Sequence, residues 1–246
     1  MARYRALVEY DGTGFYGFQR QRAEFVTVQG VLERALGELV RDPVVVTGAG
    51  RTDTGVHATG QVISFTIEWR HGVGALCRAL NANLPNTIAV RHVDEVALSF
   101  HPRFDARRRE YKYYIFNAGV RSPLRRRHSW YVPRPLRVEQ LNQASTILVG
   151  VHDFATFGLP TQGTVTIREV FNARWQLANE FLVFTVSANA YLYRMVRSLV
   201  GSLVNVGLQI WSVKDFEAAF YARDRNRSGP AAPPQGLYLT SITYDD

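Results

Sequence analysis

One short stretch of the sequence carries the residue types that acid–base or nucleophilic chemistry needs. Between Pro43 and Ile67 the only acidic residue is Asp53, with Arg51 before it and His57 after it. Glycines at positions 48, 50, 55 and 60 let the backbone take unusual conformations and pass close to a ligand. A neighbouring guanidinium favours the ionised form of a carboxylate, and a fixed carboxylate can act as a nucleophile or a base.

Local chemistry alone leaves a second interpretation open. Thr-Asp-Thr-Gly is also a turn sequence, in which the aspartate side chain bonds to the backbone two residues further on. The run Ala49–Ala58, which reads AGRTDTGVHA, closely resembles the active-site motif of the tRNA pseudouridine synthase A family. The family motif reads GRTDAGVH, so the resemblance implies that Asp53 is the catalytic residue. Thr54 replaces the usual alanine and leaves the acid unchanged.

The first turn of the chain has a glycine pattern typical of dinucleotide-binding sites, but the residues that follow it do not fit such a site. Glycines at 12, 14 and 17 match G-x-G-x-x-G. A dinucleotide-binding helix should begin at once, whereas the polar Phe-Gln-Arg-Gln run that starts at Phe18 has no helical period. The segment Tyr10–Gln21 instead resembles the first motif of the synthase family, with Phe18 where the family usually has tryptophan.

Tyr111 is the aromatic candidate in the second half. On an alternating strand Tyr111, Tyr113 and Ile115 share one face, and this pattern alone favours a core tyrosine. The Tyr-Lys-Tyr run that begins at Tyr111 resembles the second family motif, whose first tyrosine lies against the target base. A ring stacked on an extruded uridine is physically sensible.

Arg197 is the second candidate there. It lies close to the apolar stripe of a helix expected over residues 192–207, and pattern alone favours a surface arginine. The segment Met195–Gly201 resembles the third family motif, which implies that Arg197 pairs with the catalytic aspartate. Gly201, one turn later, would allow another backbone segment to approach closely. With Arg51, Tyr111 and His57, Arg197 makes up the expected substrate-binding set.

Charge points to a polyanionic partner. The chain has 246 residues and a formal net charge of +8, and Lys112 and Lys214 are its only lysines among 29 basic residues. Arginines cluster at 107–109, 125–127 and 223/225/227, a pattern that fits either a phosphate-binding surface or a solvated face. The single cysteine, Cys77, excludes an intramolecular disulfide, and the spacing of the six histidines predicts no metal site.

The periodicity of the apolar residues predicts an α+β fold made of two ferredoxin-like βαββαβ units. We expect their antiparallel sheets side by side with a central active-site cleft, and a boundary after residue 103, giving domains 1–103 and 104–246. In the first half, strands are expected over 3–10, 44–47, 60–69 and 87–96, and helices from the Thr27 N-cap to before Pro43 and over 73–80. In the second half, strands are expected over 110–117, 165–177, 181–187 and 237–244, and helices over 138–149, 192–207 and 213–221.

The resemblance implies a tRNA pseudouridine synthase that isomerises uridines 38 to 40 of the anticodon stem and loop and acts as a homodimer. Such chemistry is redox-neutral, so no cofactor is expected. A signal peptide and a membrane span are not apparent, which favours a cytoplasmic protein. Two other classes are less favoured. A non-catalytic RNA-binding protein on the same scaffold should show an RNP-type aromatic motif, and a glycoside hydrolase should show two opposed carboxylates.

Overall fold

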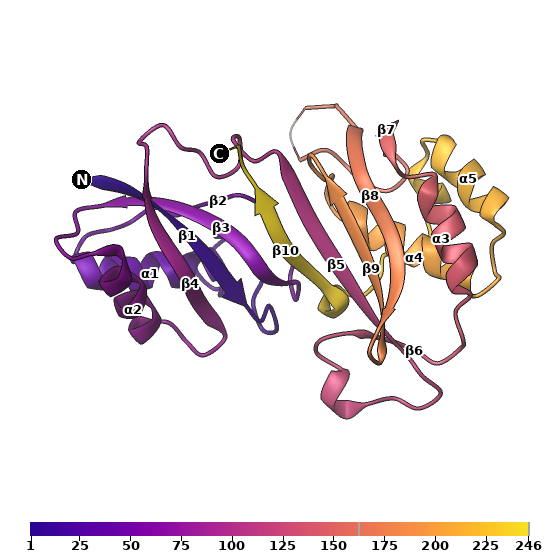
Figure 1. Ribbon diagram of the computed structural model, residues 1–246, viewed down its shortest axis with the longest axis horizontal. Helices are drawn as coiled ribbons and strands as arrows, with labels where there is room; N and C mark the ends of the chain where they lie inside the picture. The colour runs from indigo at the N-terminus through magenta and orange to yellow at the C-terminus, as the bar shows by residue number, and fades with distance from the viewer. Residues whose placement is uncertain (162, 246) are drawn as a thin grey trace. The chain divides into compact units, whose positions relative to one another are not determined.

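The computed structural model describes residues 1–161 and 163–245, which form two compact units (Figure 1). Unit 1 comprises Met1–Arg107 together with the chain from Tyr238 on, and unit 2 comprises Arg108–Leu237. Unit 2 is thus an insertion within unit 1. The boundary expected after residue 103 differs from this division by four residues, and the last strand, expected in the second half, groups with unit 1 from Tyr238 on.

Unit 1 has a ferredoxin-like order of elements. Its helices are α1 (Val28–Val40) and α2 (Val73–Asn83), and its strands are β1 (Ala2–Tyr10), β2 (Thr47–Gly48), β3 (His57–Ile67), β4 (Ile88–Val96) and the C-terminal β10 (Leu237–Thr243). The strands β4, β1 and β3 pair antiparallel in that order, and β2 pairs antiparallel with β3. At the same edge of β3, β10 runs parallel and places Tyr238 beside His57. Both helices lie on one face of this sheet (Figure 1).

The first helix forms as its sequence predicts. The Thr27 side chain accepts a hydrogen bond from the N–H of Gly30 (3.3 Å), and the residues of α1 that face the core recur with a helical period. The helix ends at a left-handed Arg41 (φ 57°), just before Pro43. This helix is therefore confirmed.

The strand expected over residues 44–47 is wrong for most of its length, because β2 begins only at Thr47. Side chains of α1 take the place of a neighbouring strand. The N–H of Val46 donates to the Glu33 carboxylate (3.1 Å), and the Gln29 amide donates to the Val46 carbonyl (2.9 Å). Side chains of α1 thus satisfy both polar backbone groups of Val46 outside the sheet.

The strands of unit 2 also pair mostly antiparallel. Its strands are β5 (Arg108–Asn117), β6 (Trp130–Val132), β7 (Gly150–Asp153), β8 (Ile167–Ala178) and β9 (Phe181–Ala188). Its helices are α3 (Val138–Thr146), α4 (Met195–Gly207) and α5 (Val213–Tyr221), with 3₁₀ turns at Pro123–Arg125, Arg225–Arg227 and Pro234–Gly236. The order is β5-β9-β8-β7, and β6 runs parallel to β5.

Most elements of unit 2 match the expectations. The β8–β9 hairpin turns at Asn179 (φ 53°), and α5 has the expected bounds. The first helix is shorter than expected and ends at Thr146, which leaves Gly150–Asp153 to form the unexpected edge strand β7. The short strand β6 was also not expected. The sequence β5, α3, β8, β9, α4 nevertheless follows the order of a ferredoxin-like unit.

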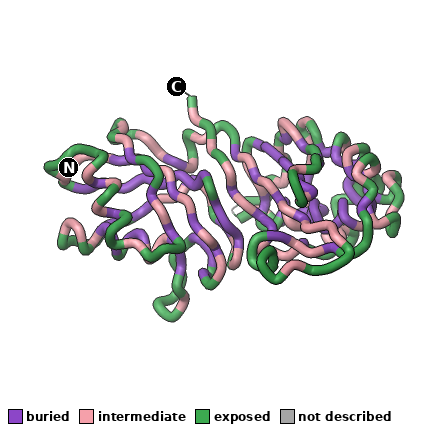
Figure 2. Tube along the Cα trace, turned by 60° about the horizontal axis from the view of Figure 1, so that its bottom comes forward, coloured by how far each residue is buried: buried purple, intermediate pink, exposed green. Residues whose placement is uncertain are grey.

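Burial is deepest along the central strand of each sheet (Figure 2). In β3, Gln61–Phe65 is buried without interruption, and in β9 the same holds for Leu182–Ala188. In the part of the chain that the structure describes, no helix has the length and hydrophobicity needed to cross a bilayer.

Candidate active site

The loop that carries Asp53 is fixed at its start by β3. The buried side chain of Gln61 donates to the Gly50 carbonyl (2.8 Å) and accepts from the Gly50 N–H (3.3 Å). The N–H of Ala49 donates to the carbonyl of Val62 (2.8 Å). The backbone just before Arg51 therefore cannot move without breaking bonds to the central strand of unit 1.

Thr52 is the second fixed point of this loop. Its buried hydroxyl lies 2.7 Å from the hydroxyl of Tyr10, at the end of β1, and its carbonyl accepts the N–H of Phe18 (3.1 Å). Burial raises the pKa of Tyr10 well above its usual value, although hydrogen bonds with Thr52 and Gln61 oppose the shift. Tyr10 is thus a neutral phenol that ties the end of β1 to the loop.

Asp53 follows directly and is partly exposed. Its carbonyl accepts the N–H of Val56 (3.1 Å), which closes a turn over Asp53–Val56. This backbone turn differs from the side-chain turn that the sequence suggested for Thr-Asp-Thr-Gly, and it presents the carboxylate of Asp53 on a loop with fixed ends. Such a group is suited to act as a nucleophile or a base.

The expected ion pair between Arg51 and Asp53 is absent from the described residues. Arg51 is exposed, and its side chain has neither a hydrogen bond nor an ion pair there. Arg51 therefore offers its guanidinium to solvent or to a ligand.

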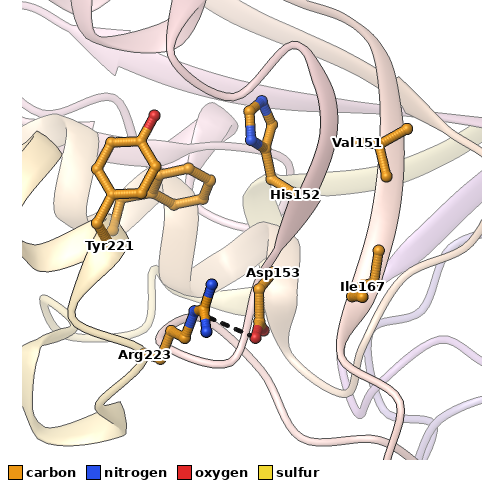
Figure 3. Close-up of a pocket in the computed structure, with 7 residues that line it drawn as sticks. Val151, His152, Asp153, Ile167, Tyr221 and Arg223 are labelled. Atoms are coloured by element: carbon orange, nitrogen blue, oxygen red, sulfur yellow. Dashed lines mark ion pairs between the residues drawn. The ribbon is translucent and has the colours of Figure 1, made fainter.

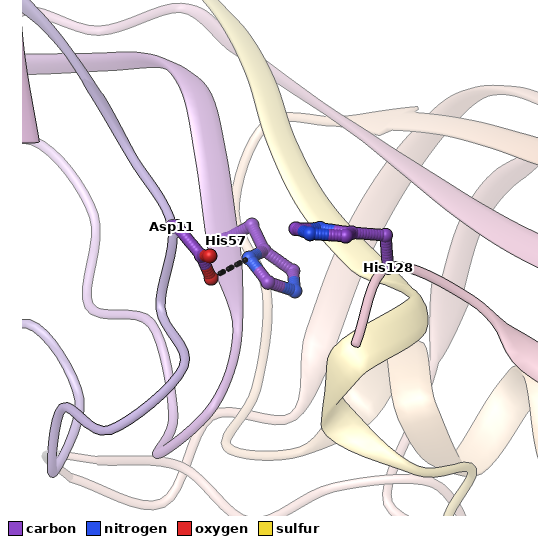
Figure 4. A group of neighbouring side chains, drawn as sticks. All are labelled: Asp11, His57 and His128. Carbon is purple, nitrogen blue, oxygen red and sulfur yellow. Dashed lines mark ion pairs between the residues drawn. The ribbon is translucent and has the colours of Figure 1, made fainter. Parts of the chain in front are cut away.

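His57 is the first residue of β3 and is only 1% exposed. Figure 4 shows its ring turned toward Asp11. Its Nδ1 accepts the N–H of Gly12 (3.0 Å) and lies 3.1 Å from the carboxylate of Asp11. The ring stacks on Tyr238 of β10, with centroids 4.6 Å apart and planes 21° from parallel. The structure thus places His57 within the protein framework of unit 1, under the loop rather than on its surface.

The first motif packs directly against the Asp53 loop. A Cβ atom on Gly12 would lie 2.0 Å from the carbonyl oxygen of Val56, so only glycine allows this approach. The carboxylate of Asp11 accepts the N–H of Thr13 (2.9 Å), which fixes the turn that presents Gly12. This packing explains the two resemblances to the family, at Tyr10–Gln21 and at Ala49–Ala58, as one structural assembly.

Tyr111 lies near the start of β5 in unit 2, opposite Val186 of β9. The expected shared face is confirmed, because Tyr111, Tyr113 and Ile115 are all buried. The ring meets Tyr191 edge to face at 5.0 Å and is 7% exposed. Burial, with smaller effects of nearby charged groups, raises the pKa of Tyr191 well above its usual value. Tyr111 thus sits in a packed aromatic pair.

Arg197 lies in the first turn of α4 and is partly buried. Its Nε donates to the carbonyl of Ala232 (2.7 Å), while the Ala232 N–H donates to the Arg197 carbonyl (2.9 Å). A Cβ on Gly201 would lie 1.7 Å from the carbonyl oxygen of Pro230, which confirms that the chain passes close to the helix there. This arrangement orients the guanidinium and excludes the loose surface arginine that pattern alone favoured.

Several arginines of the three clusters are bound within the protein itself. Arg107 pairs with Asp245 (2.7 Å). Arg225 donates to the carbonyl of Thr156 and to the hydroxyl of Ser198, both at 2.9 Å. These two guanidinium groups act in the structure of their own unit.

Other arginines of these clusters are available to bind a ligand. Arg126 and Arg227 are exposed, and their side chains make no hydrogen bond or ion pair with any described residue. Arg125, beside Arg126, pairs with Glu180. The clusters thus contain both structural and solvent-facing arginines, a difference that charge counting does not reveal.

Unit 2 also has a hollow of about 330 Å³ between β7 and the end of α5 (Figure 3). Tyr221, His152 and Ile167 line it, and Arg223 pairs there with Asp153 (3.4 Å). Within the sheet of unit 2, β7 lies three strands from the β5 strand of Tyr111. Because its arginine already faces a carboxylate, the hollow is poorly suited to a phosphate.

The structure brings Asp53, Arg51 and His57 together at one loop of unit 1, and it places Tyr111 and Arg197 in unit 2. Sequence reasoning missed Asp11 and Tyr238 as partners of His57. Asp11 lay within a recognised motif, which was a usable signal. No local signal marked Tyr238, since it is 181 positions away in the chain.

Comparison with known proteins gives one consistent result. A family model described as tRNA pseudouridine synthase matches residues 6–105 and 144–245. A protein named tRNA pseudouridine synthase A from Pseudothermotoga lettingae is 40% identical over 248 residues and covers 99% of this chain and 100% of that protein. Proteins of the same name from Bartonella henselae (40% over 250 residues) and Thermotoga petrophila (37% over 246 residues) have the same coverage.

Among solved structures, one titled "Crystal Structure of a Cbf5-Nop10-Gar1 Complex" covers 97% of this chain and 59% of that chain, with 11% identity and a TM-score of 0.40.

Proposed function

We propose that this chain, which belongs to the tRNA pseudouridine synthase family, isomerises uridine to pseudouridine at positions 38 to 40 of the tRNA anticodon stem and loop. One observation carries the proposal. In a chain of this family, the loop that matches the active-site motif holds the carboxylate of Asp53 between two fixed points, at Thr52 and Val56. The relatives described above are named tRNA pseudouridine synthase A, which supports tRNA as the substrate and uridine isomerisation as the reaction.

The reaction is an isomerisation in which atoms and electrons balance within the nucleoside. The N1–C1′ bond breaks, the base turns, and C5 bonds to C1′ while its proton is released and N1 gains one. The target base must first leave its stack, as in other enzymes that act on a base. Asp53 acts at the extruded nucleoside as the nucleophile or base.

The other candidates receive roles that fit their surroundings. Arg51 is exposed, so we assign it to the RNA backbone, where the planar guanidinium suits bidentate phosphate contact. As the family resemblance implies, Tyr111 contacts the uracil and Arg197 pairs with the Asp53 carboxylate. The bonds of Arg197 to Ala232 restrict its guanidinium, which supports a role that needs a fixed direction.

The decisive assay is tritium release from tRNA that contains 5-tritiated uridine, because formation of the C5–C1′ bond expels the label. The intact protein should release tritium without added metal or nucleotide, and Asp53→Asn should abolish release while tRNA affinity stays within about twofold. Asp42→Asn, a change at an exposed acid outside the loop, is the matched control and should release tritium normally. Tight tRNA binding without release by the intact protein would support the non-catalytic RNA-binding alternative.

We further propose that the enzyme works in the cytoplasm as a homodimer, as the family resemblance implies. Light scattering of the purified protein should then give twice the chain mass of 27.8 kDa. A monomer at assay concentration would refute the dimer without affecting the assignment of the reaction.

A further inference from the structure

We propose that His57 is a positioning residue that sets the place of Asp53 by holding the backbone of Gly12, and that it does not contact the substrate. The inference rests on the proposed function, because it takes Asp53 to be the reacting carboxylate. It replaces the substrate-binding role that the sequence suggested for His57.

Burial argues against a substrate contact. The His57 side chain is 1% exposed, and Tyr238 covers one face of its ring. On its Nδ1 side the ring meets the N–H of Gly12 and the carboxylate of Asp11. In this arrangement the His57 side chain packs against other protein groups and supports the loop that carries Asp53.

The hydrogen bond from the Gly12 N–H also bears on which ring nitrogen of His57 carries the proton. A backbone N–H donates to Nδ1 only if that atom has a lone pair, so this hydrogen bond requires the tautomer that carries its proton on Nε2. A proton on Nδ1 would turn the ring toward Asp11 as a donor and leave the buried N–H of Gly12 without this acceptor. Losing the partner of a buried donor is costly.

The link from Gly12 to Asp53 passes through Val56. The Val56 carbonyl rests against the α-carbon of Gly12, at a place where any Cβ would collide, and the Val56 N–H bonds to the Asp53 carbonyl. His57 is the next residue and bonds to the Gly12 amide. Val56 and His57 therefore both hold Gly12 in place, Val56 by van der Waals contact and His57 by a hydrogen bond.

The opposite end of the turn has its own anchor on β1. Tyr10 bonds to Thr52, the residue before Asp53, while Gly12 meets Val56 and His57, the residues after the turn. Asp53 thus lies between two anchors supplied by residues 10 and 12. Removing the His57 bond weakens the second anchor, because Gly12 is then held by the Val56 contact alone.

Paired substitutions separate positioning from simple packing. His57→Asn keeps a polar oxygen near the position of Nδ1, whereas His57→Gln moves the polar group one bond further out. We expect kcat for tritium release to fall about 100-fold in His57→Gln, because displacing a catalytic group by about 1 Å has an effect of that size. KM should stay within about twofold, and His57→Asn should recover kcat to within about fivefold of the intact protein.

Controls make the result specific. His71→Gln changes an exposed histidine of the same unit and should leave kcat and KM unchanged. Equal losses of kcat in the Asn and Gln variants, or a loss expressed in KM, would overturn the proposal.

A second measurement needs no variant to fold. Hydrogen exchange of the intact protein should show strong protection of the Gly12 amide, and rapid exchange there would also overturn the proposal. Failure of the proposed function would give a different result. The intact protein would then release no tritium, whether the Gly12 amide exchanges slowly or rapidly.

Discussion

At the scale of single residues, one phenol, Tyr10, is bonded to the loop that carries Asp53. The hydroxyl of Tyr10 contacts Thr52, and it also interacts with Gln61, the side chain that holds Gly50. One oxygen atom thus connects β1, the loop and β3. This connection makes the Tyr10 hydroxyl more important for the position of Asp53 than its distance along the chain suggests.

Tyr10→Phe removes only that oxygen. We expect kcat to fall at least tenfold and the free energy of unfolding to fall by about 1 kcal/mol, the usual contribution of one hydrogen bond. Tyr4→Phe is the matched control, since Tyr4 is buried on the same face of β1 and its hydroxyl makes no hydrogen bond with the described residues. Tritium-release kinetics and urea unfolding measure both effects. Equal behaviour of the two variants would contradict this role for Tyr10.

The sequence located the loop that carries Asp53 but not the residues that hold it in place. Asp53 and His57 fall within ten residues that match a family motif, so their type and spacing were visible. The support of His57 comes from Gly12 and from Tyr238, which approach it only through the pairing of strands. Sequence proximity also placed Arg51 beside Asp53, whereas in the structure Arg51 is exposed and makes no ion pair with the described residues.

At the scale of elements, α1 has two functions. It covers the sheet of unit 1, and its polar side chains Gln29 and Glu33 bind the backbone of Val46 just before β2. Glu33 is 9% exposed and pairs with Arg20 (3.0 Å). A helix thus directs the chain toward the strand from which the Asp53 loop departs.

Glu33→Ala leaves the buried N–H of Val46 without its acceptor. We expect a loss of about 1 to 3 kcal/mol in the free energy of unfolding, the range for an unsatisfied buried donor. Glu38→Ala changes an exposed acid on the same helix and should alter stability by less than about 0.5 kcal/mol. Urea unfolding of both variants tests this. A Glu33→Ala protein as stable as Glu38→Ala would show that water replaces the carboxylate at Val46.

Helices were easier to predict than short strands for a physical reason. The apolar period of α1 and its Thr27 cap are local signals, and this helix was found. The strands β6 and β7 consist of three and four residues, too few for an alternating pattern to stand out. Residues 44–46 resembled a strand because valines favour strands, yet side chains of a helix supply their hydrogen bonds.

At the scale of the molecule, the arginines fall into two functional groups. We expect Arg126→Gln and Arg227→Gln to weaken tRNA binding and to reduce the slope of log K against log salt by about 1 for each phosphate that is no longer bound. Arg225→Gln should instead lower thermal stability and leave the slope unchanged, because its guanidinium is bound to Thr156 and Ser198. Binding titrations at several salt concentrations provide the measurement. A smaller slope for Arg225→Gln would refute this division.

Buried phenols predict how the molecule responds to alkali. Burial raises the pKa of Tyr10, Tyr113 and Tyr191 above the usual value of 10.0. The folded state therefore keeps these protons when the unfolded chain releases them. Their contribution to stability is complete below pH 10 and is lost as pH rises through the folded pKa values, by about 1.4 kcal/mol per pH unit for each tyrosine. Melting temperatures measured between pH 9 and 11 should fall above pH 10, and a flat profile would contradict the prediction.

The parallel pairing of β10 with β3 has a consequence for how the protein folds during its synthesis. Tyr238 reaches His57 only after the ribosome has made the 180 residues between them, so the Asp53 loop gains this neighbour only at that point. A nascent chain, or one terminated before β10, can form α1, β1 and β3, yet it lacks the strand that covers His57. Synthesis through β10 thus becomes a condition for activity, and chains that stop before it should be inactive toward tRNA and readily removed by proteases.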